Sequence, residues 1–198
     1  MTVDQVAVAA AAVIASYFLG NISPAILLGR MSGVDIRKEG SGNAGTTNVL
    51  RVLGKKAAAA TLAIDVLKGV AAVLLGRYLC GQDVAMMCGV AAFCGHIWPA
   101  AFRFKGGKGV ATALGVIVAT APVLGAGILA VALAIIAATK RVSAGAVCAA
   151  LIFPAAAAIY DRSLLAWSAV LAVIVLVKHR QNIGRLLAGV EPKISFKK

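Results

Sequence analysis

Long apolar runs separated by short clusters of charge constrain this chain more than any other feature. The runs fall near residues 6–29, 57–79, 84–102, 109–139, 142–160 and 163–177. A membrane-spanning helix needs about 20 consecutive apolar residues. The chain is 61% hydrophobic and only 14% charged, whereas a soluble domain is typically about half apolar and about a quarter charged. We therefore expect an all-α integral membrane protein that forms a single domain over residues 1–198.

The run 109–139 is too long for one span of ordinary thickness. Pro122 and Gly125 lie near its middle, and both residues disfavour an uninterrupted helix. We interpret this run as two short helices joined by a turn around residues 121–126. The chain is then predicted to have seven transmembrane helices.

The distribution of basic residues supports this count and predicts an orientation. With the N-terminus outside and the C-terminus in the cytoplasm, 17 of the 20 Lys and Arg residues lie on the inner side, in 30–56, 103–108, 140–141 and 178–198. This is the bias that the positive-inside rule describes. It also explains most of the net charge of +13, so we predict no nucleic-acid partner. The N-terminus lacks the basic region of a signal peptide and is kept as the first span.

The four cysteines do not indicate a metal site or a disulfide framework. Cys80, Cys88, Cys94 and Cys148 form no CxxC pair and lie mostly within the apolar runs, which is typical of packed cysteines. We therefore predict no metal and no cofactor.

The first polar motif is GSGNAGTTNVLR, residues 40–51. Glycines allow successive N–H groups to point at one anion, and arginine offers a planar fork suited to phosphate or carboxylate. We predict Ser41 and Arg51 as functional side chains, and the following residues as substrate-binding: Gly40, Gly42, Asn43, Gly45, Thr46, Thr47 and Asn48. The alternative is a flexible cytoplasmic loop. A dinucleotide fingerprint is rejected, because the preceding DIRKE does not predict the required strand.

The second motif is GHIWPAAFRFKGGKGVAT, residues 95–112. Its FKGGKG segment directly precedes an expected helix, whose N-terminus favours anions. We predict Lys108 as a functional side chain, and Lys105, Gly106 and Gly107 as substrate-binding. Lysines that anchor a helix at the headgroups remain an alternative, above all for Lys105. His96 is interpreted as a helix-terminal or packed histidine.

The third motif is KHRQNIGRLLAGVE, residues 178–191. A basic cap on anionic lipid explains Lys178, Arg180 and Arg185 well. It explains His179 and Asn182 less well; on a continuing helix these two share a face, and we predict both as functional. Within the second span, Asp65 and Lys68 also stand three residues apart. They are functional candidates by default, but an ion pair that holds helices together explains them at least as well, and we leave them out of the site.

Taken together, the segments NISPAILLGR, GSGNAGTTNVLR, GHIWPAAFRFKGGKGVAT and KHRQNIGRLLAGVE resemble the bacterial acyl-phosphate:glycerol-3-phosphate acyltransferase family, often called PlsY. The resemblance covers nearly the whole chain, and the motifs occur in the family's order. The family often has Ala where this chain has Thr46.

The resemblance implies an enzyme of the bacterial cytoplasmic membrane with its site facing the cytoplasm. It implies transfer of a fatty acyl group from acyl phosphate to the 1-hydroxyl of sn-glycerol 3-phosphate, the first acylation of phospholipid synthesis. The products are 1-acylglycerol 3-phosphate (lysophosphatidate) and inorganic phosphate. Carried over by position, the functional side chains are Ser41, Arg51, Lys108, His179 and Asn182. We predict no obligatory protein partner and a monomer.

Two questions stay open at this point. The hydroxyl proton is accepted either by His179 or by the donor's own phosphate, and we favour the phosphate slightly. The competing function is a transporter of a phosphorylated solute, since anion-facing helix ends suit that role too.

Overall fold

The computed structural model describes residues 2–194, and these residues form helices and loops without a strand. The described chain divides into two compact units, one from the N-terminus to Thr120 and one from Ala121 onward. The all-helical class predicted from the sequence is confirmed. The single domain predicted over residues 1–198 stays a prediction.

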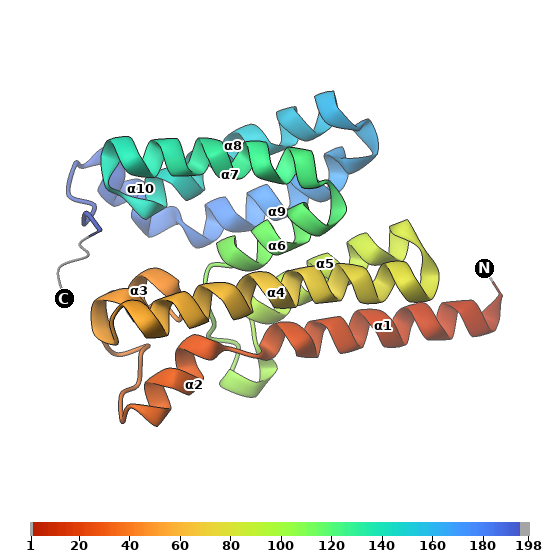
Figure 1. Ribbon diagram of the computed structural model, residues 1–198, viewed down its shortest axis with the longest axis horizontal. Coiled ribbons are helices and arrows are strands. Elements are labelled where there is room, and N and C mark those ends of the chain that lie inside the picture. The colour runs from red at the N-terminus through yellow and green to blue at the C-terminus, as the bar shows by residue number, and fades with distance from the viewer. Residues whose placement is uncertain (1, 195–198) are drawn as a thin grey trace. The chain divides into compact units, whose positions relative to one another are not determined.

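Unit 1 packs three long helices side by side (Figure 1). Its elements are α1 (Val3–Asn21), α2 (Pro24–Met31), α3 (Thr46–Val52), α4 (Lys55–Cys80), α5 (Gln82–Ile97), a short 3₁₀ turn η1 (Ala100–Phe102) and α6 (Val110–Thr120). Helix α1 contacts both α4 and α5, and α4 also contacts α6. The two loops that carry the first and second motifs are therefore attached to the same bundle.

Small residues allow these helices to approach closely. A Cβ on Gly69 of α4 would collide with the Thr112 carbonyl of α6, and one on Gly115 of α6 would collide with the Val66 carbonyl of α4. In lipid there is little hydrophobic drive between helices, so close backbone packing is what holds them together. The Ala- and Gly-rich composition thus serves packing.

Unit 2 is built from the C-terminal helices. Its elements are α7 (Pro122–Thr139), α8 (Val142–Tyr160), a 3₁₀ turn η2 (Arg162–Leu164), α9 (Leu165–Lys178) and α10 (Arg180–Leu187). Helix α8 contacts α7, α9 and α10. The chain bends by 64° between α9 and α10, so His179 lies at a helix break. The expected continuing helix through His179 and Asn182 was wrong.

The predicted interruption of run 109–139 is present but is shorter than expected. Helix α6 ends at Thr120, and Ala121 alone is non-helical, with φ −141° and ψ 83°. Pro122 begins α7 at the first helical position, where its missing N–H costs nothing. Gly125 lies inside α7 rather than in the turn.

Five helical segments among the described residues are long and apolar enough to cross a membrane: Val3–Met31, Lys55–Cys80, Gln82–Phe102, Pro122–Thr139 and Val142–Tyr160. The bent pair α9 and α10 makes a sixth if it is one span. Helix α6 has 11 residues, a rise of about 16 Å against a hydrocarbon core of about 30 Å. Seven spans and the direction of the termini therefore stay predictions.

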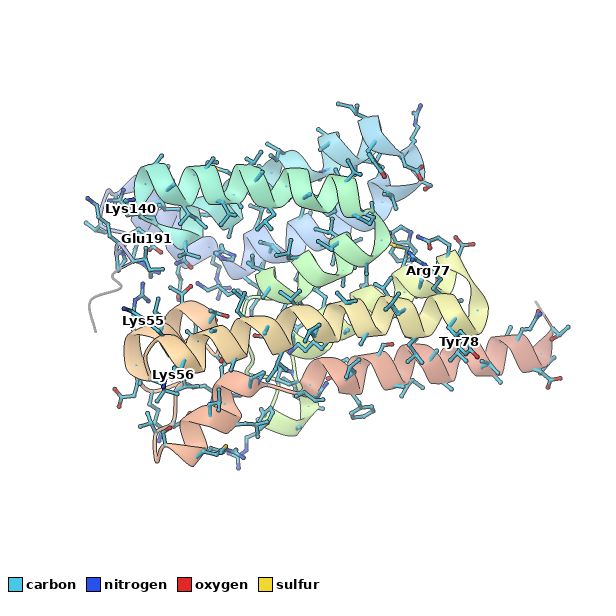
Figure 2. The ribbon with its side chains drawn as sticks, viewed as in Figure 1. Lys55, Lys56, Arg77, Tyr78, Lys140 and Glu191 are labelled. Carbon is cyan, nitrogen blue, oxygen red and sulfur yellow. The ribbon has the colours of Figure 1, made fainter. Side chains whose placement is uncertain are left out.

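Basic residues gather at one end of α4. Lys55 and Lys56 begin the helix, whereas Arg77 and Tyr78 lie in its last turn, and Figure 2 shows the two pairs at opposite ends. The 40–48 loop precedes α4 by a few residues, so this motif lies at the Lys55 end.

Candidate active site

The loop 40–48 is organised around the side chain of Asn48, which is 1% exposed. Its Nδ2 donates to the carbonyls of Ile36 at 3.0 Å and Glu39 at 2.9 Å, and its Oδ1 accepts from the N–H of Ser41 at 2.8 Å. Gly40 has φ +59°, and a Cβ there would collide with Asn48 Oδ1. Asn48 therefore shapes the loop through bonds to its backbone. Its predicted part as a substrate-binding residue has to be an indirect one.

Several other polar groups of this loop form no hydrogen bond with Asn48. Thr46 and Thr47 begin α3, and within the described residues their N–H groups have no hydrogen-bond acceptor, as is usual for the first turn of a helix. The buried Oγ1 of Thr46 likewise has no partner among the described residues. The Ser41 side chain is exposed. The two N–H groups and the Ser41 hydroxyl are therefore candidate donors to a ligand.

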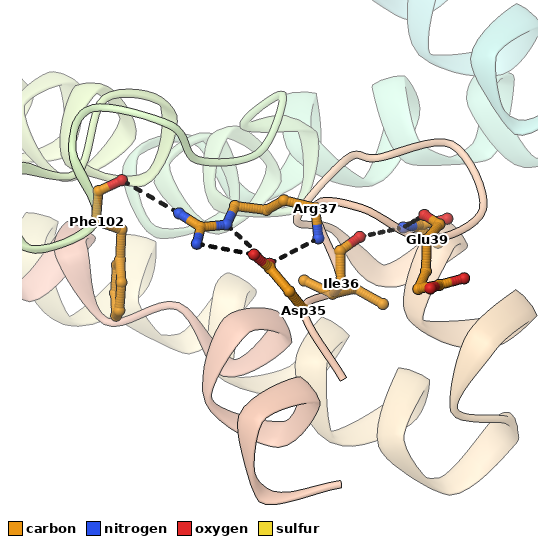
Figure 3. A network of polar contacts seen from close by, with 6 residues as sticks. Asp35, Ile36, Arg37, Glu39 and Phe102 are labelled. Atoms are coloured by element: carbon orange, nitrogen blue, oxygen red, sulfur yellow. Dashed lines mark hydrogen bonds and ion pairs between the residues drawn. The ribbon is translucent and has the colours of Figure 1, made fainter. Parts of the chain in front are cut away.

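Arg37 ties this loop to the second motif (Figure 3). Its guanidinium pairs with Asp35, with Nε 3.0 Å from Oδ1, and its Nη1 donates to the carbonyl of Phe102 at 3.4 Å. Hydrogen bonds from the Arg37 side chain and from its backbone N–H hold the pKa of Asp35 below its usual range. Arg37 thus links the start of the first loop to η1.

The second motif folds back on the end of α5. The N–H of Gly106 donates to Ile97 O, and that of Gly107 donates to His96 O, each at 3.2 Å. Gly109 has φ +81°, a left-handed conformation that glycine adopts without strain. Lys105 is exposed and Lys108 is half-buried. The glycines therefore let the loop lie directly on α5 just before α6 begins.

The first two motifs lie against each other within unit 1. A Cβ added to Gly107 would be 2.7 Å from the carbonyl oxygen of Ala44, so the two loops are in backbone contact. Arg51 lies in the last turn of α3, half-buried, and its guanidinium has no hydrogen bond or ion pair with another described residue. Unit 1 therefore places the 40–48 loop against the Lys108 loop, and Arg51 follows the first of these loops on α3.

The third motif belongs to unit 2, where it is organised by a residue that the sequence did not single out. Glu191 Oε1 accepts from Ser143 Oγ of α8 and from Asn182 Nδ2 of α10, both at 2.6 Å, and its Oε2 pairs with Arg185 Nε at 2.6 Å. Burial alone would raise the pKa of Glu191, but the bonds from Ser143, Asn182 and Arg185 outweigh it and hold that pKa below its usual range. The sequence signal that could have identified Glu191 is its position as a single acidic residue at the end of a basic segment.

His179 has one ring nitrogen committed to the backbone. Its Nδ1 lies 2.8 Å from the Val175 carbonyl, and a carbonyl only accepts, so Nδ1 carries the proton and Nε2 is the basic nitrogen. His179 and Asn182 are both buried. Convergence of this third motif with the two in unit 1 stays a prediction.

The remaining expectations concern buried charge and metals. Lys68 Nζ lies 2.7 Å from Asp65 Oδ1, so the predicted ion pair is present. His96 is buried in the last turn of α5, as expected. Among the described residues, no three His, Cys, Asp or Glu side chains are grouped as a metal site requires.

The apolar helices and the two polar loops at their ends define a helical integral membrane protein with a candidate anion site. A family profile described as "Glycerol-3-phosphate acyltransferase" matches residues 10–189. The chain belongs to the glycerol-3-phosphate acyltransferase family.

Curated relatives and solved structures agree with this assignment. A protein from Thermoanaerobacter pseudethanolicus named glycerol-3-phosphate acyltransferase is 48% identical over 187 residues, covering 93% of this chain and 94% of the relative. One of the same name from Geobacter sulfurreducens is 48% identical over 180 residues, covering 89% and 92%. The crystal structure of PlsY, described as an integral membrane glycerol 3-phosphate acyltransferase, matches in its glycerol 3-phosphate form with a TM-score of 0.90 at 37% identity, covering 94% and 96%. Its lysophosphatidic acid form matches with a TM-score of 0.87 at 36% identity, covering 95% and 96%.

Proposed function

We propose that this chain, a membrane glycerol-3-phosphate acyltransferase, moves a fatty acyl group from acyl phosphate to the 1-hydroxyl of sn-glycerol 3-phosphate. The products are 1-acylglycerol 3-phosphate and inorganic phosphate, and the reaction is the first acylation of phospholipid synthesis. The observation that carries the proposal is the match over more than nine-tenths of the chain to one protein in both its glycerol 3-phosphate and its lysophosphatidic acid form. These two ligands are the acceptor and the acylated product of the same reaction.

The polar loops of unit 1 suit two substrates that both carry phosphate. Arg51 and Lys108 hold glycerol 3-phosphate and neutralise its charge. The N–H groups at Thr46 and Thr47, which are unpaired among the described residues, hold the phosphoryl group of the donor together with the 40–48 loop. The N–H groups of Gly106 and Gly107 are bonded to carbonyls of α5, so these glycines contribute by letting the chain lie close to the substrate. Backbone nests and guanidinium forks are both phosphate-binding devices. Ser41, His179 and Asn182 orient the substrate oxygens.

In this reaction the protein has to position the two substrates and stabilise developing negative charge. The 1-hydroxyl oxygen attacks the acyl carbonyl carbon, a new ester C–O bond forms, and the bond from that carbon to the phosphate oxygen breaks. Phosphate leaves with both electrons of that bond, and the hydroxyl proton passes to it or to His179 Nε2. An acyl phosphate is an activated mixed anhydride, so positioning and stabilisation of the developing oxyanion supply most of the rate.

The proton acceptor is tested with His179→Ala. We favour the donor phosphate, so this variant is expected to keep substantial turnover and to lose the orientation that the imidazole gives. Turnover abolished at every pH would make His179 the obligatory base instead. A covalent acyl-Ser41 intermediate is disfavoured, because the Ser41 side chain is exposed whereas the carboxylate–histidine pair of unit 1, Asp65 and His96, is buried; isolation of an acyl-Ser41 adduct would reverse this.

The site is placed at the cytoplasmic face of a bacterial inner membrane, in a protein with seven spans and an outward N-terminus. The clustering of Lys55 and Lys56 at the loop end of α4 supports this orientation, since cytoplasmic segments carry an excess of Lys and Arg. The 40–48 loop lies at the Lys55 end of the long helix α4, whereas a transporter site lies near the membrane midplane.

The donor is tested directly with purified protein in detergent. Glycerol 3-phosphate is offered with palmitoyl phosphate, and separately with palmitoyl-CoA or acylated acyl carrier protein, while phosphate and lysophosphatidate are measured. Equal amounts of both products from palmitoyl phosphate alone are expected. Activity with a thioester donor only would contradict the donor assignment, and glycerol 3-phosphate uptake into vesicles without acylation would favour the transporter.

A further inference from the structure

A buried polar cluster lies beneath the second loop and takes no part in the reaction as described above. It consists of Asp65 and Lys68 of α4 and His96 of α5, which are 1%, 3% and 5% exposed. Charged groups inside a membrane bundle are expensive, and an apolar filling of the same space is often more stable. A cluster kept at this cost calls for a purpose beyond holding helices together.

Lys68 is the centre of the cluster and joins three helices. Its Nζ donates to the carbonyl of Ile22 at 2.7 Å, lies 2.9 Å from His96 Nδ1 and 2.7 Å from Asp65 Oδ1. Ile22 stands at the break between α1 and α2, where its carbonyl has no helical N–H to accept from. Asp65 Oδ1 also lies 3.2 Å from His96 Nδ1, so the carboxylate contacts both the ammonium and the imidazole.

His96 contacts both this cluster and the second loop. His96 Nδ1 lies 2.9 Å from Lys68 Nζ and 3.2 Å from Asp65 Oδ1, so both charged groups hold the imidazole in place. Its other ring nitrogen, Nε2, faces Gly107 so closely that a Cβ there would collide with it. The backbone carbonyl of His96 also accepts from the N–H of Gly107 at 3.2 Å. The ring and the backbone of His96 thus fix the residue directly before Lys108.

We propose that Asp65, Lys68 and His96 are positioning residues that set the 105–109 loop and, through it, the placement of Lys108 in the acyltransfer site. This inference rests on the proposed function, because it assigns the cluster to the residue that we place on the substrate phosphate. Asp65 and Lys68 themselves touch no substrate. A displacement of about 1 Å at a catalytic group costs about 10²-fold in rate, so a rigid support under this loop has kinetic value.

The test is a double-mutant cycle on turnover. Asp65→Asn/Lys68→Met removes both charges together and leaves no lone buried ion, so it avoids the main reason for misfolding. In the wild-type background we expect kcat to fall by about 10- to 100-fold. In a Lys108→Ala background, Asp65→Asn/Lys68→Met is expected to change kcat by less than about threefold. The reason is that this background has no Lys108 side chain whose position the cluster could set. Equal losses in both backgrounds, or a kcat for Asp65→Asn/Lys68→Met within about twofold of wild type, would overturn the proposal.

A second measurement does not depend on activity. Amide hydrogen exchange across residues 105–109 is compared between wild type and His96→Gln, which keeps a neutral side chain able to accept from Lys68. Faster exchange confined to this segment is expected, with the 40–48 loop and the ends of α8 as internal references. Unchanged exchange at 105–109 would overturn the proposal. Failure of the proposed function would instead appear as a wild-type protein that makes no lysophosphatidate from acyl phosphate.

Discussion

At the scale of single residues, the two polar loops are shaped by side chains that hold backbone. Asn48 binds Ile36, Glu39 and Ser41, and its burial means that loss of its amide would leave several backbone groups unpaired, each at a cost of about 1–3 kcal/mol. Some polar side chains of a glycine-rich loop thus bind its own backbone, and others face solvent. The sequence predicted the loop but could not make this division, because an amide suits either role.

Gly107→Ala tests whether the contact between the two loops matters for catalysis. The added methyl would collide with His96 Nε2 and lie 2.7 Å from Ala44 O, so the loop before Lys108 must shift. We expect kcat to fall by about 100-fold while the protein still folds. Steady-state kinetics with acyl phosphate measure this.

The matched control is Gly127→Ala in α7, where a Cβ would have no atom within 4 Å. It is expected to keep wild-type turnover and to gain slightly in helix stability. Wild-type turnover in both variants would refute the importance of the loop contact.

At the scale of elements, Glu191 joins α8 to α10 through Ser143, Asn182 and Arg185. Its folded pKa lies below the ordinary value of 4.5. A lowered folded pKa contributes stability that is fully present above the unfolded pKa and is lost as the pH falls through the folded pKa. The contribution of Glu191 is therefore complete at neutral pH and disappears in acid.

Glu191→Gln tests this contribution. Glutamine keeps an oxygen for Ser143 and Asn182 but loses the charge that pairs with Arg185. We expect a lower Tm than wild type at neutral pH, with a difference that shrinks as the pH falls below 4.5. Thermal unfolding in detergent measures it, with Glu39→Gln as control because the Glu39 side chain is exposed. A Tm difference that does not change with pH would contradict the assignment.

The sequence predicted a helix boundary well where an apolar run meets a proline. It predicted boundaries and bends less well where contacts between distant residues determine them. Pro122 marked the start of α7 correctly, but Gly125 suggested a longer turn than exists, because a single extended residue is enough to end α6. The bend at His179 follows no proline or glycine, so no local signal predicted it. The partners of Asn182 and Lys68 lie 9 residues away at Glu191 and 46 residues away at Ile22, and only the folded chain reveals such pairs.

At the scale of the whole molecule, each unit gathers basic side chains at one end. In unit 1 these are Lys55 and Lys56, opposite Arg77 on α4. In unit 2 these are Lys140 (Figure 2) and Arg141, which lie between α7 and α8, whereas Arg162 follows the other end of α8. The guanidinium of Arg141 donates to the Glu191 carbonyl at 2.9 Å. This pattern is what the positive-inside rule predicts for a helical membrane protein.

Cysteine labelling tests the proposed orientation. In a chain whose Cys80, Cys88, Cys94 and Cys148 are replaced by Ala, we introduce Lys56→Cys or Tyr78→Cys; both native side chains are exposed and lie at opposite ends of α4. An impermeant thiol reagent is expected to label Tyr78→Cys in intact cells and Lys56→Cys only after permeabilisation. The reverse pattern would invert the topology and place the loops outside.

The central claim is that the polar loops of unit 1 hold the phosphate of the acceptor. The most direct measurement is the KM for glycerol 3-phosphate in Arg51→Ala at saturating acyl phosphate, compared with Arg162→Ala, which removes an exposed arginine from η2. Loss of a charged hydrogen-bonding partner of phosphate costs about 1.5–3 kcal/mol, so we expect the KM of Arg51→Ala to rise by about 10- to 100-fold and that of Arg162→Ala to stay at the wild-type value. An unchanged KM in Arg51→Ala, in a protein that still turns over, would contradict the placement of the acceptor phosphate at this loop.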